Sequence, residues 1–383
     1  MNFNYISAKD IRRSLAMICL AGAIAIMALA PGALRAANFY DGKTITILVG
    51  SRAGSGLDFH ARSLAPFMKK HIPGNPTVIV KFMPGAGGQK AQNFLYEKAR
   101  PDGQTIFFGG FAPLGQITDR PGFRSKYEDF NFVGGLGGIW LLMARKDAVA
   151  NFKSSADFIN AKNFRFGGSS PARPPSMLGR LGLDVLGVNY TYISGYRGSR
   201  AVNLAMRRGE VSAQATTIAA FKGAYEQTTD LSKVVLAFHY PTVKSDGTFV
   251  PHPEINAGPY FLDLYKQTHN GKMPSGLTWE ALKWVLSVQM PMSIAIMTSP
   301  KAPEAGVKDL QAAFKKSTVD PDYLAVYTKR GSPPFIPTVA EDAIKRIALM
   351  KKTSPQLVAF FKEYLKAKGS KKVSKPKGKG KKK

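Results

Sequence analysis

Three times between residues 44 and 110, a short apolar run typical of β-strands leads into a glycine-rich loop. The apolar runs are 44–49, 76–82 and 105–108, and helical patterns follow the first two loops at 57–70 and 91–99. This order predicts a parallel sheet covered by helices. Ligands of such sheets bind at the carboxyl ends of the strands, where these loops lie. Pro66 should kink or break the first helix, because proline lacks the N–H that a helix interior needs.

The first of these loops, residues 50–58, has the composition of an anion-binding turn. The N–H groups at a helix start are unpaired within the helix and carry the positive end of its dipole. A strand, a glycine loop and a helix start therefore suit an anion, and an ordinary βα turn is the alternative. The Gly54-Ser55-Gly56 segment begins like a dinucleotide fingerprint, but Phe59 replaces the last glycine, which argues against a nucleotide site.

A second unit of the same kind follows. The apolar, glycine-rich stretch 130–143 is expected to cross into it, and residues 151–237 repeat the alternation of strands, polar loops and helices. Residues 241–278 should be irregular, a helix is expected at 277–288, and a strand at 293–297 should return to the first unit. The predicted domains are a first lobe (37–144), a second lobe (145–240), an irregular insert and return helix (241–290), and the rest of the first lobe (291–365). We expect an α/β fold of two lobes, each a mostly parallel sheet flanked by helices.

Residues 1–36 have the layout of a secretory signal peptide. A basic start at 9–13 precedes a 16-residue apolar run at 15–30, and the alanines at 36 and 37 offer a cleavage site. The run is short for a membrane span, which needs about 20 residues, although an uncleaved anchor helix is the alternative. Cys19, the one cysteine, lies in this run, so the mature protein should have neither a disulfide nor thiol chemistry. The expected location is the periplasm.

The formal net charge of +29 favours anionic partners through its long-range field. Residues 366–383 contribute +10 through ten lysines without an acid, and residues 1–36 contribute +3, which leaves +16 for the body. The tail cannot bury a core and is expected to be disordered. It lacks the aromatic residues that stack on bases, so no specific nucleic-acid partner is expected. It either contacts anionic envelope polymers or lipid headgroups, or is merely solvated.

The chain carries no motif for catalysis, a cofactor or a metal. It has no Gly-Lys-Ser/Thr phosphate loop, no Gly-x-Ser-x-Gly elbow and no His-Glu-x-x-His pair. Its five histidines are scattered singly, without zinc-ligand spacing. The polar glycine loops suit binding, with serine hydroxyls and loop amides as hydrogen-bond donors. We therefore expect no enzyme activity, no cofactor and no metal.

Several segments together resemble one known family. They are 42–50 (GKTITILVG), 53–62 (AGSGLDFHAR), 71–80 (HIPGNPTVIV), 83–88 (MPGAGG), 101–103 (PDG), 196–199 (YRGS), 208–211 (RGEV), 302–314 and 320–324 (DPDYL). They are similar to the substrate-binding proteins of tripartite tricarboxylate transporters, which are Bug-type periplasmic solute receptors. The resemblance covers about residues 38–345 and is most specific in the first hundred residues after the signal.

The resemblance implies a two-lobed periplasmic binding protein of the type II kind. Its lobes close on a small organic carboxylate like a hinge, and it delivers this ligand to a separate membrane permease. Backbone amides and ordered waters would hold the carboxylate. The implied ligand-binding residues are Ser51, Ala53, Gly54, Ser55, Gly56, Asp58, Gly85, Ala86, Gly87, Gly88, Phe111, Ala112, Gly168, Ser169, Ser170, Tyr196, Arg197 and Ser199.

The chain departs from the family pattern in the second lobe. The family usually has a Gly-Ser-x-Gly-x-Gly-Ser loop, whereas residues 168–176 contain prolines and Arg173, which indicates a different cargo. Arg52 and Arg173 either pair bidentately with a ligand carboxylate or lie exposed at the rim. Asp58 either caps the first helix or faces the ligand. The cap is slightly favoured, because a negative charge beside a carboxylate would cost affinity.

Three functions follow from these features. The leading one is capture of a small organic acid for transport. The second is a periplasmic sensor with the same ligand site and a signalling partner. The third, an enzyme acting between the lobes, is the least supported because no nucleophile or metal motif is present.

Overall fold

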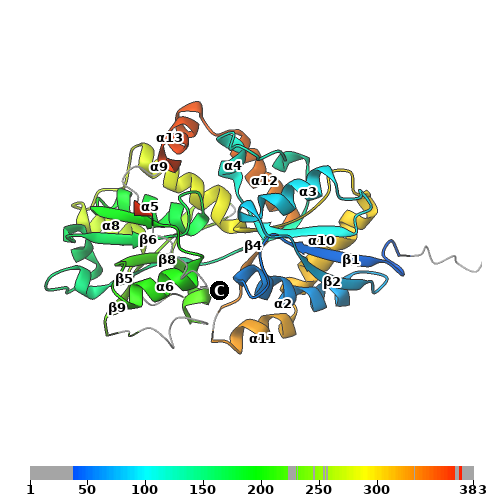
Figure 1. Ribbon diagram of the computed structural model, residues 1–383, viewed down its shortest axis with the longest axis horizontal. Coiled ribbons are helices and arrows are strands. Elements are labelled where there is room, and N and C mark those ends of the chain that lie inside the picture. The colour runs from blue at the N-terminus through cyan, green and yellow to red at the C-terminus, as the bar shows by residue number, and fades with distance from the viewer. Residues whose placement is uncertain are drawn as a thin grey trace, which may run out of the picture.

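The computed structural model describes residues 38–222, 230, 232–244, 246–252, 255, 258–331, 333–366 and 371–372. The predicted signal peptide, with Cys19, lies outside the described residues, as does most of the lysine-rich tail. The described chain forms two six-stranded sheets, each flanked by helices, that build two neighbouring lobes (Figure 1). This is the predicted α/β, two-lobed architecture.

Lobe 1 is built on the first sheet. In spatial order its strands are β13 (Ile336–Val339), β4 (Asn131–Gly137), β12 (Ile294–Thr298), β3 (Thr105–Gly110), β1 (Thr44–Val49) and β2 (Thr77–Phe82). β1 pairs in parallel with β2 and β3, whereas β12 is antiparallel to β3 and β4, and β13 is antiparallel to β4. The sheet is therefore mixed, and its parallel half is the part that the strand–loop–helix repeat encodes.

Lobe 2 is built on the second sheet. In spatial order its strands are β14 (Lys371–Lys372), β7 (Tyr190–Ser194), β6 (Phe164–Gly167), β8 (Ala213–Thr217), β5 (Trp140–Arg145) and β9 (Val234–His239). The pairs from β14 to β8 are parallel, and β5 is antiparallel to both β8 and β9. Because β5 already pairs in this sheet, the predicted boundary at 144/145 is corrected to Gly138–Ile139, between β4 and β5.

The helices cover both sheets. Those of lobe 1 are α2 (Gly56–His71), α3 (Gln89–Glu97), α4 (Pro113–Ile117), α10 (Glu304–Thr318), α11 (Pro321–Thr328) and α12 (Ala340–Lys351). Those associated with lobe 2 are α5 (Pro174–Val185), α6 (Ser199–Arg207), α7 (Ile218–Ala220), α8 (Phe261–Thr268), α9 (Leu277–Trp284) and α13 (Pro355–Leu365). The predicted irregular segment thus contains α8 and a hairpin of β10 (Thr242–Val243) with β11 (Phe249–Val250). α13 packs on α9, so it does not extend lobe 1 as the predicted range 291–365 assumes.

The central strands of both sheets are buried on both faces, as expected for strands covered by helices on each side. In lobe 1, Ile47 and Phe108 belong to one apolar cluster, while Leu48 and Phe107 face the opposite way into another. This second cluster continues into lobe 2 through Trp284 and its neighbours in α9 and the π-helical turn that follows. The lobes therefore share a continuous apolar core on one side, where the chain returns to β12.

Helix α2 runs unbroken through Pro66, so the predicted break is wrong. Pro66 is exposed, whereas Leu64, Ala65 and Met68 are buried against lobe 1. The carbonyl that loses its partner at a proline therefore lies on the solvent side, where water can hydrogen-bond to it. Burial of the apolar face holds the helix together across this position.

Candidate functional site

The loop after β1 is ordered by its own hydrogen bonds. Ser55 is the N-cap of α2 and accepts from the Asp58 N–H at 3.2 Å, and its hydroxyl oxygen lies 2.6 Å from that of Ser51. The carboxylate of Asp58 accepts from the Gly54 N–H at 2.6 Å and from Arg62 Nε at 2.7 Å. Asp58 is buried, and both of its oxygens bind the protein. Ser55, and not Asp58, is thus the N-cap of α2, whereas the Asp58 carboxylate is occupied by a loop N–H and by Arg62.

The loop after β2 packs directly on the loop after β1. A Cβ at Gly50 would lie 3.1 Å from the Cα of Gly88, and a Cβ at Gly88 would lie 3.3 Å from the Gly50 carbonyl oxygen. Gly88 also has a φ of 104°, and Ala86, two residues earlier, has a φ of 45° despite its side chain. Positive φ at a residue with a side chain costs energy and tends to occur at functional sites. The two glycines permit this close approach, and the tight turn presents the amides of residues 85–87 to solvent.

The loops after β6 and β7 contact each other in lobe 2. The Gly195 N–H donates to the Ser169 carbonyl at 2.9 Å, and the Tyr196 N–H donates to the Gly168 carbonyl at 3.4 Å. Ser199 opens α6, with Gly198 as the N-cap. The α5 helix begins at Pro174, with Arg173 as its N-cap residue.

The two lobes meet between these loops. The Cβ position of Gly87 in lobe 1 lies 4.0 Å from Cζ of Arg173 in lobe 2. Together with the contacts above, this links four loops, which we call the interlobe loops: 50–58, 83–88, 168–173 and 195–199. Most of the predicted ligand-binding residues are thereby brought together.

The interlobe loops carry free hydrogen-bond donors. Within the described part of the chain, no acceptor pairs with the backbone N–H groups of Arg52, Ala53, Ser169, Ser170 and Arg197. The helices α2, α5 and α6 begin at these loops, so their dipoles add positive potential. The loops therefore offer an anion several N–H donors and no unpaired carboxylate.

Two predicted residues lie outside this arrangement. The side chain of Phe111 is fully buried against Tyr127, with ring centroids 4.6 Å apart. Its N–H donates to the Ser293 carbonyl, and its carbonyl accepts from Gln289 Nε2. The Ala112 N–H donates to the Tyr127 hydroxyl at 2.9 Å. The N–H groups of both residues are thus occupied within lobe 1, so neither offers a free backbone donor, and their assignment as ligand contacts stays a prediction.

Gly168 also has a structural role. Its N–H donates to the Ile193 carbonyl, and a Cβ there would lie 2.4 Å from the Ser176 hydroxyl oxygen. The position is therefore closed to any side chain, and its two backbone groups extend the sheet. Ser169 and Ser170, which follow, keep their N–H groups free, so the free donors of this loop begin at Ser169.

Arg173 contributes a positive charge to the interlobe loops. Desolvation by surrounding protein lowers the pKa of Arg173 below its ordinary value, and the positive charge of Arg120, after α4, adds to the effect. Arg173 nevertheless remains accessible to solvent. No local motif marks Arg120, a single arginine that follows a short helix.

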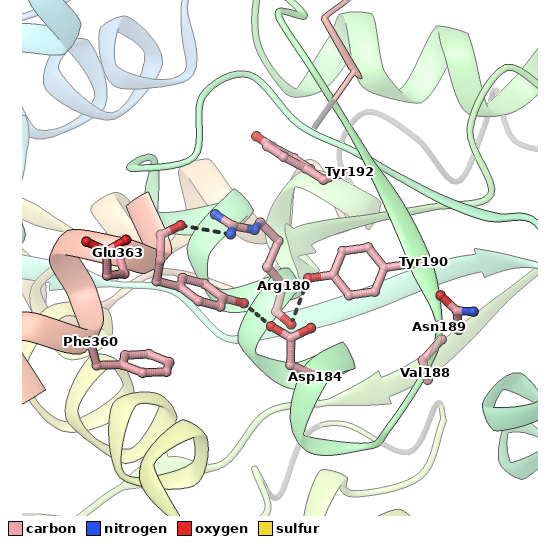
Figure 2. A pocket seen from close by; sticks show the side chains of 9 residues that line it. Arg180, Asp184, Val188, Asn189, Tyr190, Tyr192, Phe360 and Glu363 are labelled. Atoms are coloured by element: carbon pink, nitrogen blue, oxygen red, sulfur yellow. Dashed lines mark hydrogen bonds between the residues drawn. The ribbon is translucent and has the colours of Figure 1, made fainter. Parts of the chain in front are cut away.

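The structure also contains a cavity of about 450 Å³ on lobe 2, between α5, β7 and α13 (Figure 2). Arg180 Nη2 donates to the Tyr364 carbonyl at 2.9 Å, the Tyr364 hydroxyl donates to Asp184, and the Tyr190 hydroxyl donates to the Arg180 carbonyl at 3.4 Å. Burial raises the pKa of Asp184. Most of these polar groups therefore bind one another and fasten the C-terminal helix to lobe 2.

The described residues show neither a candidate membrane span nor a candidate metal site. None of the described helices has both the length and the apolar character that a membrane span requires. No cluster of three or more His, Cys, Asp or Glu side chains suited to a metal ion occurs among the described residues.

The fold was compared with known proteins. No protein-family model and no curated protein sequence matches the chain. Among solved structures, the periplasmic binding protein BugD superposes with a TM-score of 0.59 at 18% identity, covering 87% of this chain and 100% of BugD. MatC from Rhodopseudomonas palustris with bound malate gives 0.58 at 18% identity, covering 84% and 99%. The R. palustris protein Rpa4515 with adipate gives 0.58 at 16% identity, covering 86% and 99%. At these identities the likeness concerns the fold, and this chain has the two-lobed fold of periplasmic binding proteins.

Proposed function

We propose that the protein is a periplasmic solute-binding protein that captures a small organic carboxylate between its lobes and delivers it to a tripartite tricarboxylate-type membrane permease. The observation that carries this proposal is the set of interlobe loops. They bring free N–H groups and helix N-termini from both sheets to one place, without an unpaired carboxylate. MatC and Rpa4515, which have the same fold, were solved with malate and adipate.

The energetics are sufficient for capture. A hydrogen bond to a charged group contributes about 1.5–3 kcal/mol net. Four or five such bonds, after the cost of ordering the ligand, support binding near −8 kcal/mol, or roughly micromolar affinity. Closure of two lobes about a hinge is a common way to exclude water from such a ligand.

A thermal-shift screen of the mature protein against mono-, di-, tri- and aromatic carboxylates tests the proposal. We expect at least one acid to raise the melting temperature in a concentration-dependent way. Native mass spectrometry of freshly purified protein should show a co-purified acid. Absence of any shift across the whole library would count decisively against capture of a carboxylate.

Export and the tail belong to the same proposal. Cleavage near residues 36 and 37 should appear in the intact mass of protein taken from the periplasm.

The six lysines of residues 373–383 should bind anionic lipid headgroups, each contributing about 1 kcal/mol near the surface. Deleting 373–383 should reduce sedimentation with anionic vesicles at low salt and leave thermal shifts unchanged. Equal sedimentation of both forms would reject tethering by the tail.

A further inference from the structure

Helix α5 starts differently from the other helices at the interlobe loops. Its first two residues are Pro174 and Pro175, which have no N–H group, whereas α2 and α6 begin with residues that keep theirs. Free N–H groups in the first turn are the donors through which a helix start binds an anion. Two of these donors are therefore missing at the start of α5.

Arg173, the N-cap residue of α5, supplies other donors at this position. Its backbone is fixed, because its N–H donates to the Ser170 carbonyl at 3.1 Å and its carbonyl accepts from the Met177 N–H at 2.9 Å. A guanidinium carries five N–H donors in a planar fork. The chain thus has a long, charged side chain where the other two helices offer backbone donors.

The side chain of Arg173 reaches the other lobe. Its Cζ lies 4.0 Å from the Cβ position of Gly87, in the exposed turn 85–87 of lobe 1. Within the described residues, no acceptor pairs with the backbone N–H groups of this turn. Its middle residue, Ala86, has a φ of 45°, a conformation that costs energy for a residue with a side chain and tends to occur at functional sites. Donors from opposite lobes therefore lie side by side without an acceptor.

The guanidinium of Arg173 is not used by the protein itself. Other arginines of this chain pair with acids, for example Arg62 with Asp58 at 2.7 Å and Arg124 with Glu97 at 2.6 Å. Arg173 is exposed, and in the described part of the chain it neither forms an ion pair nor donates a side-chain hydrogen bond. Its donors and those of the turn 85–87 are thus available to one and the same anion.

We propose that Arg173 and the N–H groups of the turn 85–87 bind one carboxylate of the cargo together, with the guanidinium contributed by lobe 2 and the N–H groups by lobe 1. This inference rests on the proposed function. A guanidinium can donate two parallel hydrogen bonds to one carboxylate, which a lysine cannot do. Arg173 is then the specificity-determining residue, because its charge favours an ionised carboxylate over a neutral group. Since the anion joins the two lobes, its binding also favours their approach.

Calorimetry on the mature chain tests this inference with acetate, benzoate, succinate, adipate and citrate, and with any other acid that raises the melting temperature of the wild type. For each acid that the wild type binds, Arg173→Gln should weaken binding by about ten- to a hundredfold, because it removes a charged partner of the carboxylate. Arg173→Lys keeps the charge but lacks the planar fork, so it should still bind at least about fivefold more weakly than the wild type.

Two controls separate a direct contact from a general effect of charge. The ratio of the wild-type affinity to that of Arg173→Gln should change by less than about threefold between about 0.05 M and about 0.5 M sodium chloride, whereas an effect through the long-range field alone is screened by salt. Arg207→Gln removes an exposed arginine at the far end of α6, which forms no ion pair within the described residues, and this variant should bind like the wild type.

The stability of the ligand-free protein gives a further readout. Arg173→Gln should melt within about 2 °C of the wild type, because the side chain has no partner in the described part of the chain. A clearly lower melting temperature would assign Arg173 a structural role and would overturn the inference.

The outcomes separate the inference from the proposed function. If the wild type binds no acid at all, the proposed function fails and the inference fails with it. If the wild type binds an acid, the inference alone is overturned by equal binding of Arg173→Gln, by full recovery in Arg173→Lys, or by an affinity ratio that falls to about one at high salt.

Discussion

His60 should make the stability of this protein depend on pH in the mildly acidic range. Its Nδ1 lies 2.9 Å from the Tyr327 hydroxyl, and its ring meets that of Phe335 edge-on at 4.3 Å. Burial lowers the pKa of His60 to about 4, and the charge of Arg330 adds to this effect. The neutral imidazole is thus the form that the folded protein accommodates.

The magnitude follows from the difference between the folded and unfolded pKa values. The unfolded chain has an ordinary histidine pKa near 6.5 and the folded chain a pKa of about 4. At about 1.4 kcal/mol for each tenfold change in the equilibrium constant, this difference sets an upper bound of about 3.5 kcal/mol. Between these pKa values the unfolded state binds more protons than the folded state. The contribution of His60 is therefore fully present above pH 6.5 and is lost as the pH falls toward about 4. Because His60 keeps some solvent access, we expect about 1–2 kcal/mol in practice.

Urea unfolding followed by far-ultraviolet circular dichroism, from about pH 7.5 to about pH 4.5, measures this effect. His60→Phe keeps a ring of similar size but cannot be protonated. This variant loses the contact with Tyr327, which lowers its stability by the same amount at every pH. As the pH is lowered, its stability should fall less steeply than that of the wild type. The control is His269→Phe, which makes the same replacement at a histidine of lobe 2. His269 also packs on an aromatic ring, with its ring centroid 3.9 Å from that of Tyr265. Parallel pH profiles for the wild type and His60→Phe would refute the reasoning.

Four further substitutions test local structure, each read from urea midpoints. Ser55→Ala removes the N-cap of α2 and should lower the free energy of unfolding by about 1 kcal/mol; no change would mean that another group caps the helix. Gly134→Ala places a Cβ 2.3 Å from Phe314 Cε1 and should cost about 1–3 kcal/mol, whereas Gly56→Ala meets no atom within 4 Å and should cost little. Asp58→Asn should lower stability and leave carboxylate affinity within about twofold, and a large affinity change with full stability would instead place Asp58 at the ligand.

Local patterns in the sequence predicted the parallel half of each sheet. Strands β1, β2 and β3 and the helices α2 and α3 follow from alternating apolar runs, glycine loops and helical periodicity, which act over a few neighbouring residues. The resemblance predicted the fold and the interlobe loops on the same segments.

Pairings between distant segments were decided only by the tertiary structure. The antiparallel position of β12 between β3 and β4, and the packing of α13 on α9, depend on chain returns that no local pattern encodes. The loop after β3 resembles its neighbours in sequence, yet Tyr127 and Gln289 engage its backbone from other parts of the chain.

The sequence by itself therefore determined the strand–loop–helix units and the loops with the composition of a donor-rich turn, because glycine, serine and helix starts act locally. The tertiary structure decided which of these loops meet, and it placed Arg173 of lobe 2 beside Gly87 of lobe 1. Such contacts join segments that lie far apart in the sequence, so they become visible only once the chain has folded.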